Sequence, residues 1–154
     1  MAVNSVHSII GEVGVMGGGI RERNHKHMNV KGEENMATFI ISGSRGTDDP
    51  TMATLPFMAA KVAKEQGHDV VLWLWNESVT LGRKGTADYV TGVNLTPLKD
   101  LLAALQAANI PIWVCGACAV ARQIGAGDLV AGATIKGMPD YIKAVAERDR
   151  NVAF

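Results

Sequence analysis

Charged residues and cysteines are both scarce in this chain of 154 residues. Charged residues make up 19% of it, below the roughly 25% typical of globular proteins, which favours a homo-oligomer that covers part of its surface. The net charge is zero, so the composition offers no basic surface for nucleic acid or for an anionic membrane. Two cysteines cannot form a secreted disulfide scaffold. We therefore expect a cytoplasmic protein with a close cysteine pair.

Segments that would direct the chain to a membrane are also missing from the sequence. The uncharged stretch 109–121 is too short to cross a bilayer and contains Pro111. The N-terminus has no basic cluster followed by an apolar core, so no signal peptide is predicted.

Residues 1–35 differ in composition from the rest of the chain. They hold 6 of the 17 glycines and three of the four histidines, and apolar residues show no helical or strand spacing after Ile20. The glycine run 17–19 lacks the G-x-G-x-x-G spacing of a nucleotide loop. We expect a poorly ordered leader over residues 1–35, with at most a short strand around 6–10, and a single domain over residues 36–154.

From Met36 onward, strand-like and helix-like segments alternate. Strands are expected at 38–42, 69–75, 110–115 and 133–135, with an edge strand at 152–154. Helices are expected at 50–66, 97–108, 117–124 and 138–148. The segment 77–94 is expected to be a loop with a short helical turn. This alternation predicts a parallel sheet with helices on both faces, an α/β fold. Asp49 and Thr96 are expected to cap the first two helices, and Gly67 to end the first.

In parallel sheets of this kind, functional residues follow the carboxyl ends of the strands. This rule selects the segments 44–49, 75–77 and 115–118 and the turn near Lys136. Ser44, Asp48 and Asn76 are the substrate-binding candidates in the first two segments.

The third segment contains the two cysteines. Cys115 ends a predicted strand, and Cys118 falls in the first turn of the next helix. The positive end of a helix and its unpaired N–H groups lower the pKa of a nearby thiol, and the thiolate is the nucleophile. Arg122, four residues after Cys118, is expected to approach the sulfur atoms and to act in the same direction. We predict no metal, because a zinc site would need distant ligands such as His25 and His27.

The stretch 109–124, NIPIWVCGACAVARQI, resembles the cysteine signature of the DsrE/DsrF-like family, especially its YchN-like branch. Asp48-Asp49-Pro50 and the segment 78–82, SVTLG, support the resemblance, which covers residues 36–154. It implies a three-layer α/β/α fold with a five-stranded, mainly parallel sheet. It also implies a homo-oligomer, a trimer or hexamer, that carries sulfane sulfur as a cysteine persulfide. In this family, such carriers belong to sulfur relays that serve tRNA thiolation or dissimilatory sulfur oxidation.

Within this resemblance, the family's reactive cysteine corresponds to Cys115, and Cys118 and Arg122 match the residues that follow it. Gly116, between the two thiols, is a further candidate for contact with substrate. The glycine that usually follows the arginine is Gln123 here, so we expect any left-handed turn to begin later, at Gly125.

Three classes of function stay open. The favoured one is a sulfur carrier or sulfurtransferase-like protein that passes sulfur from Cys115 to an acceptor thiol, with sulfur donor and acceptor proteins as partners. It needs no cofactor, because the sulfur travels covalently on the protein. The second is a dithiol–disulfide oxidoreductase, although thioredoxins place their cysteines differently. The third is a non-catalytic oligomeric binding protein whose thiols are incidental.

Overall fold

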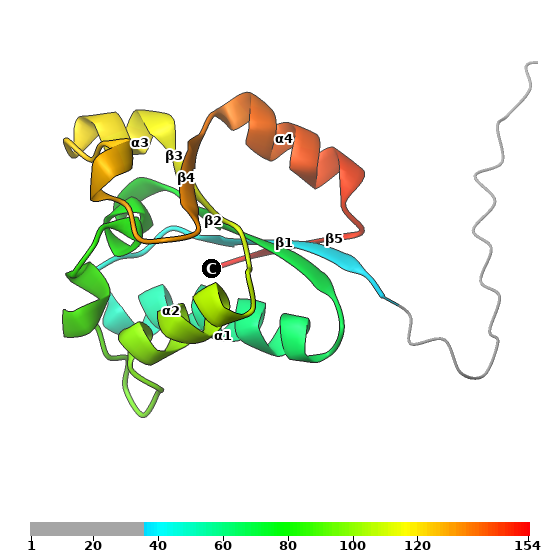
Figure 1. Cartoon of the computed structure of the whole chain (residues 1–154), viewed down its shortest axis with the longest axis horizontal. Coiled ribbons are helices and arrows are strands. Elements are labelled where there is room, and N and C mark those ends of the chain that lie inside the picture. The colour runs from blue at the N-terminus through cyan, green and yellow to red at the C-terminus, as the bar shows by residue number, and fades with distance from the viewer. Residues whose placement is uncertain (1–35) are drawn as a thin grey trace, which may run out of the picture. The chain divides into compact units, whose positions relative to one another are not determined.

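Five parallel strands form the centre of the described part of the chain, residues 36–154 of the computed structural model (Figure 1). They are β1 (Thr38–Gly43), β2 (Asp69–Leu74), β3 (Ile112–Cys115), β4 (Ala133–Lys136) and β5 (Arg150–Ala153). Their order across the sheet is β4-β3-β2-β1-β5, and every pair is parallel. The expected five-stranded parallel sheet is thereby confirmed. The leader expected over residues 1–35, with its strand around 6–10, lies outside the described residues.

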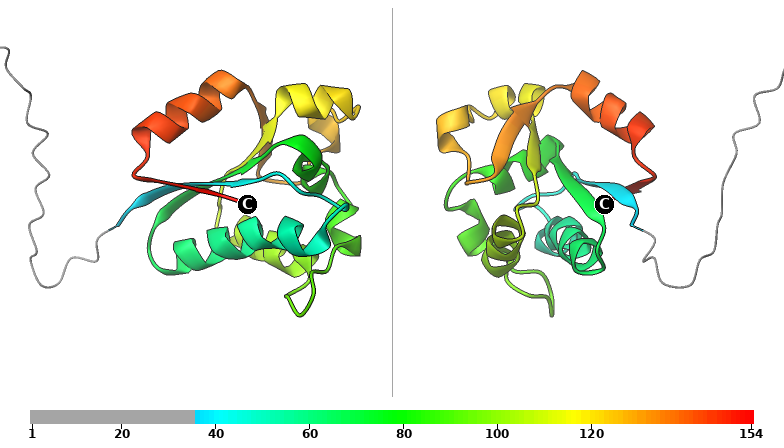
Figure 2. Two further views of the ribbon diagram at one scale, coloured as in Figure 1. Left: turned by 180° about the vertical axis from the view of Figure 1, so that it is seen from behind. Right: turned by 45° about the vertical axis from the view of Figure 1, so that its right-hand side comes forward.

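Helices cover both faces of this sheet. α1 (Pro50–Glu65) and α2 (Leu98–Ala107) lie on one face, and α3 (Gly116–Ala121) and α4 (Met138–Glu147) lie on the other (Figures 1 and 2). The three-layer α/β/α fold is confirmed. None of these helices has the length and apolar character needed to span a bilayer.

The first helix begins as its sequence predicts, whereas the second does not. The Asp49 carboxylate accepts a hydrogen bond from the Met52 N–H at 3.0 Å, and Pro50 occupies the first helical position, where its missing N–H has no cost. The predicted cap at Thr96 is wrong: Pro97 is the N-cap of α2 and makes no side-chain hydrogen bond. The helical spacing of four leucines predicts one buried stripe on α2, and all four are buried: Leu98, Leu101, Leu102 and Leu105.

Three helices end in the same hydrogen-bonded turn, in which one residue adopts a left-handed conformation. These residues are Gly67 (φ 83°) after α1, Asn109 (φ 53°) after α2 and Gln123 (φ 55°) after α3. After α3, the Gln123 N–H donates to the Val120 carbonyl at 3.1 Å and the Ile124 N–H to the Ala119 carbonyl at 2.9 Å, the pattern of a Schellman motif. The prediction that a left-handed turn waits for Gly125 is therefore wrong, and α3 ends at Ala121 because the turn follows directly.

The segment expected to be a loop with one helical turn contains two short 3₁₀ helices, η1 (Asn76–Gly82) and η2 (Thr86–Tyr89). Ser78 fixes the start of η1. Its hydroxyl accepts from the Trp75 N–H at 2.9 Å and donates to the Gly43 carbonyl of β1. The side chain is fully buried, so η1 is tied to the ends of both β1 and β2.

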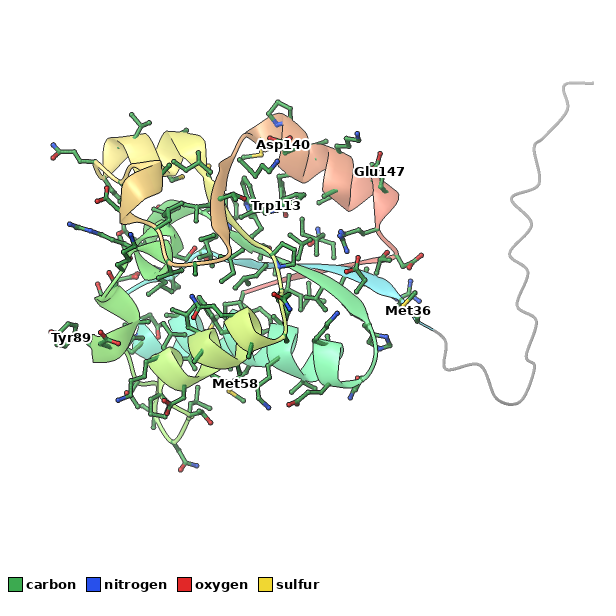
Figure 3. The ribbon with its side chains drawn as sticks, in the orientation of Figure 1. Met36, Met58, Tyr89, Trp113, Asp140 and Glu147 are labelled. Atoms are coloured by element: carbon green, nitrogen blue, oxygen red, sulfur yellow. The ribbon has the colours of Figure 1, made fainter. Side chains whose placement is uncertain are left out.

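The core lies mainly between the sheet and α1 and α2. On the opposite face, Trp73 is buried and stacks on Tyr141 of α4, with ring centroids 4.8 Å apart. Ala144 is the only buried residue of α4. A cavity of about 390 Å³ lies beneath this helix, beside Trp113, Asp140 and Glu147 (Figure 3). The face under α4 is therefore less tightly covered than the face under α1 and α2.

Candidate functional site

The two cysteines lie where β3 passes into α3, at the carboxyl edge of the sheet. Cys115 is the last residue of β3 and the N-cap of α3. Only 4% of it is exposed, and it belongs to the hydrophobic core. Cys118 is half-buried and packs against the same core. Both are free thiols. The site therefore contains one enclosed sulfur and one that is more open to solvent.

The start of η1 contacts the Cys118 sulfur. The backbone N–H of Asn76 donates to Cys118 Sγ at 3.2 Å. Asn76 has φ 52°, a left-handed conformation that asparagine tolerates better than most residues. The chain turns sharply at this point after β2, and the turn directs a main-chain donor to the sulfur.

The pKa of Cys118 is raised above its ordinary value. Burial of the thiol is the main cause, and the neighbouring Cys115 adds to it through a side-chain hydrogen bond and through its negative charge. The Asn76 N–H and the charge of Arg122 act in the opposite direction. For Cys118, the predicted net lowering by the start of the helix is therefore wrong, because the cost of burying a charge outweighs the groups that stabilise it.

Arg122 connects α3 to η1 beside the thiols. Its Nη1 donates to the carbonyl of Cys118 at 3.1 Å, and its Nη2 donates to the Asn76 side-chain oxygen at 3.4 Å. Its guanidinium also forms an ion pair with Glu77. The hydrogen bond between them lowers the pKa of Glu77 and raises the pKa of Arg122. The positive charge expected near the sulfurs is present, and it is held by a carboxylate.

Glu77 lies in the segment 75–77 that the sequence selects, but it is not among the candidate residues, and its ion pair with Arg122 is not predicted. Glu77 and Arg122 are 45 residues apart in the sequence. The signal that could have found the pair is positional: Glu77 follows the carboxyl end of the buried strand β2, and Arg122 follows α3, the helix that begins at the end of β3. Nothing in the local sequence pairs these two residues.

Two of the predicted substrate-binding residues make other contacts. The Ser44 hydroxyl donates to the Phe154 carbonyl at 3.0 Å and so fixes the end of the chain beside β1. The Asp48 carboxylate accepts from the Gly46 N–H at 2.7 Å and from Arg45 at 3.1 Å, and both contacts lower its pKa. Asp48 still lies near enough to Glu77 for its charge to raise the Glu77 pKa. Of the candidates in the first two segments, Ser44, Asp48 and Asn76, it is Asn76 that contacts a thiol.

Gly116 has a packing role. A Cβ at this position would stand 3.2 Å from Ile135 Cγ2 and 3.5 Å from the Lys136 carbonyl. Gly116 therefore lets the start of α3 lie close against β4. This close approach fixes the backbone between the two cysteines.

Within residues 36–154, no group of three or more His, Cys, Asp and Glu side chains is placed to hold a metal ion. His25 and His27, the ligands that a zinc site would require, lie outside the described residues. In the described residues, the chemistry available at this edge is that of two thiols, a main-chain donor and a paired guanidinium.

These features define an α/β protein with a cysteine pair at the carboxyl edge of a parallel sheet. Residues 36–154 match the model of the DsrE/DsrF-like family, so the chain belongs to that family. The family is known in sulfur relay generally.

Among solved structures, the chain is similar to the ychN protein from E. coli. The TM-score is 0.66 at 21% sequence identity, and the match covers 77% of this chain and 100% of the other. This likeness bears on the fold. No curated protein matches the chain.

Proposed function

We propose that this protein carries sulfane sulfur as a persulfide on Cys115 and passes it to an acceptor thiol in a sulfur relay. The observation that carries the proposal is the arrangement around Cys118: a second thiol beside Cys115, a main-chain N–H at 3.2 Å from its sulfur and the guanidinium of Arg122. Hydrogen-bond donors and a cation stabilise sulfur anions, which are both the nucleophiles and the leaving groups of persulfide transfer.

The chemistry requires no cofactor. The Cys115 thiolate attacks the outer sulfur of a donor persulfide, the donor S–S bond breaks, and the donor leaves as a thiolate. The product is a Cys115 persulfide. An acceptor thiolate then attacks its outer sulfur and regenerates Cys115. Sulfur donor and acceptor proteins are the partners that this sequence of steps demands.

A second candidate function is dithiol–disulfide exchange. The feature that favours it is the closeness of the two thiols, since Cys115 raises the pKa of Cys118. Cys118 would then attack the Cys115 persulfide or a mixed disulfide, closing a Cys115–Cys118 disulfide and releasing sulfide or a thiol.

We also propose a homo-oligomer, a trimer or hexamer, located in the cytoplasm. Several large apolar side chains are exposed on α3, β4 and α4, namely Val120, Ile135, Met138 and Ile142. Exposed apolar groups of this kind are typical of contact surfaces. Light scattering on the purified protein measures the assembly, and a monomer at micromolar concentration would contradict this part of the proposal.

Intact-protein mass spectrometry without reductant tests the main proposal. Wild type, Cys115→Ser and Cys118→Ser are treated briefly with polysulfide. Added sulfur on wild type and on Cys118→Ser, in which Cys115 is the one remaining cysteine, supports Cys115 as the carrier. Loss of two hydrogens from wild type without added sulfur favours the oxidoreductase. No change in any sample contradicts both and leaves a binding protein with incidental thiols.

A further inference from the structure

The sulfur that the proposed function assigns as the carrier is the less accessible of the two. Cys115 is 4% exposed and packs in the core, whereas Cys118 is half-buried at the edge of the site. An incoming persulfide must place its outer sulfur directly against the attacking thiolate. In this structure, Cys118 is the thiol that such a donor meets first.

We propose that Cys118 is the entry sulfur of the relay: it takes sulfane sulfur from the donor and delivers it to Cys115. This inference rests on the proposed function, in which Cys115 is the carrier, and changes its first step: Cys115 receives the sulfur from Cys118 and not directly from the donor. It also gives positioning roles to two residues of η1: the Asn76 N–H contacts the Cys118 sulfur, and Glu77 holds Arg122.

Each step of the route balances without an oxidant or a reductant. The Cys118 thiolate attacks the outer sulfur of the donor persulfide, forming a Cys118 persulfide while the donor S–S bond breaks and the donor thiolate leaves with the electron pair. The Cys115 thiolate then attacks the outer sulfur of that persulfide. The new S–S bond forms on Cys115, the Cys118 S–S bond breaks, and Cys118 is released as a thiolate that regains its proton from water.

Cys118 is an anion both when it attacks and when it leaves, and two nearby groups offset part of the cost of burying that charge. The Asn76 N–H points at its sulfur from 3.2 Å. Arg122 lies close enough for its charge to lower the Cys118 pKa. These two donors belong to different elements, η1 and the end of α3, and both contact the same cysteine.

The donors are held rigidly. The buried Ser78 hydroxyl accepts from the Trp75 N–H at 2.9 Å and fixes the turn that presents the Asn76 N–H. Glu77 binds the guanidinium of Arg122 through both carboxylate oxygens, one of them 3.4 Å from Nε. Glu77 is therefore a positioning residue, which acts on the sulfur through Arg122.

The closeness of the two thiols, which lets Cys115 raise the pKa of Cys118, supports passage of sulfur from one to the other. The negative charge of Cys115 raises the pKa of Cys118, so the pair holds one thiolate more readily than two. A site with one thiolate at a time suits sequential transfer, in which each cysteine is the nucleophile in turn.

Time-resolved loading with inorganic polysulfide tests the route. Samples of wild type, Cys118→Ser and Cys115→Ala are quenched with an alkylating agent, and peptide mass spectrometry locates the added sulfur. In wild type, sulfur is expected on Cys118 before Cys115. Cys115→Ala should load Cys118 as fast as wild type, and the sulfur should then remain on Cys118 because no Cys115 thiol is present to take it. Cys118→Ser should load Cys115 at least about tenfold more slowly but to the same final level, because close delivery within the site is lost.

The outcomes separate this inference from the proposed function. If Cys118→Ser loads Cys115 at the wild-type rate, entry through Cys118 is wrong while the carrier function stands. If neither cysteine gains sulfur in wild type, the proposed function itself fails. Circular dichroism and a thermal melt of each variant establish that slow loading is not a consequence of unfolding. If both variants unfold, the order in which the two cysteines of wild type gain sulfur tests the inference. Sulfur that appears on Cys115 before Cys118 overturns it.

Discussion

The backbone N–H of Asn76 donates to the sulfur of Cys118 across 3.2 Å, joining residues that are 42 positions apart in the chain. The donor belongs to the main chain, and it is aimed by the left-handed conformation of Asn76, with φ 52°. The identity of the side chain therefore matters mainly through the backbone conformation that it permits.

A pair of substitutions at Asn76 tests this relationship. Asn76→Gly keeps the left-handed conformation at low cost, whereas a β-branched valine is strained there by roughly 1–2 kcal/mol. Both lose the Asn76 side-chain oxygen that accepts from Arg122, so their difference isolates the backbone. Both substitutions are made in the Cys115→Ser variant, and the rate of Cys118 alkylation is measured as a function of pH. We expect Asn76→Val to raise the pKa of Cys118, so that alkylation requires a higher pH, and Asn76→Gly to leave that pKa close to the parent value. Equal profiles for the two variants would show that the N–H does not act on the sulfur.

Replacing Arg122 tests the electrostatic part of the site. The charge of Arg122 lowers the pKa of Cys118, so Arg122→Met should raise that pKa further. The rate of alkylation near neutral pH should fall by about tenfold for each unit by which the pKa rises. Arg83→Met is the matched control, because Arg83 is exposed and lies in the loop after η1. An unchanged pH profile in Arg122→Met would argue against a role for its charge at the sulfur.

The sequence predicted those features that neighbouring residues determine. Asp49 and Pro50 begin α1, Gly67 ends it, and the leucine spacing of α2 defines its buried face. Strand order and the meeting of η1 with α3 depend on contacts between distant segments, for which one sequence carries no local signal. The carboxyl-edge rule still brought Asn76, Cys115 and Cys118 into one set of candidates. It did not separate them from Ser44, whose hydroxyl binds the end of the chain.

The error at Gln123 has a specific cause. Glycine is the usual residue in a left-handed position, so its absence suggested that the turn begins later. In the structure, the buried side chains of Ala119 and Ile124 flank the turn, and the hydrogen bond between their backbones closes it. Packing thus places the left-handed residue at 123 whatever its side chain.

That conclusion predicts a stabilising substitution. Gln123 is exposed and left-handed, so Gln123→Gly relieves strain at the cost of a more flexible unfolded chain. We expect a net gain of about 0.5–1 kcal/mol in the free energy of unfolding. Gly67→Ala, at the equivalent turn after α1 with φ 83°, should lose about 1 kcal/mol. Urea unfolding of both variants measures the two changes, and a destabilised Gln123→Gly would contradict the assignment of this turn.

Asp149 should contribute to stability in a pH-dependent way. Its carboxylate accepts from the Thr38 N–H at 2.9 Å and from the Thr38 hydroxyl at 3.0 Å, and these bonds lower its pKa. A carboxyl whose pKa is lowered by folding adds stability above its unfolded pKa, and this stability is lost as the pH falls through the folded pKa. Below about pH 4, wild type should therefore lose stability more steeply than Asp149→Asn.

Thermal melts at a series of acidic pH values measure that difference. Asp140→Asn is a matched control, because Asp140, like Asp149, is an exposed acid close to a strand terminus. The Asp140 carboxylate accepts from the Gly137 N–H at 2.9 Å, one bond where Asp149 has two. Parallel curves for wild type and Asp149→Asn would show that the bond between the starts of β1 and β5 does not contribute to stability.

Gly46 links the first loop to the cysteine site through its lack of a side chain. A Cβ at Gly46 would stand 2.7 Å from the Glu77 carbonyl and 3.0 Å from Thr80 Oγ1, too close without a shift of η1. Gly46→Ala should therefore cost about 1–3 kcal/mol in the free energy of unfolding. Because η1 also presents the Asn76 N–H, the same shift should raise the pKa of Cys118 and slow its alkylation at neutral pH.

Gly127→Ala is the control for this last prediction, since a Cβ there meets no atom within 4 Å. Its stability should equal that of wild type or exceed it by up to about 1 kcal/mol, because alanine restricts the unfolded chain. Urea unfolding and the pH dependence of alkylation are measured on both variants. A Gly46→Ala protein with wild-type stability and an unchanged Cys118 profile would mean that η1 can move without disturbing the thiol. In that case the close packing of the first loop against Glu77 would not be what holds the Asn76 N–H on the sulfur.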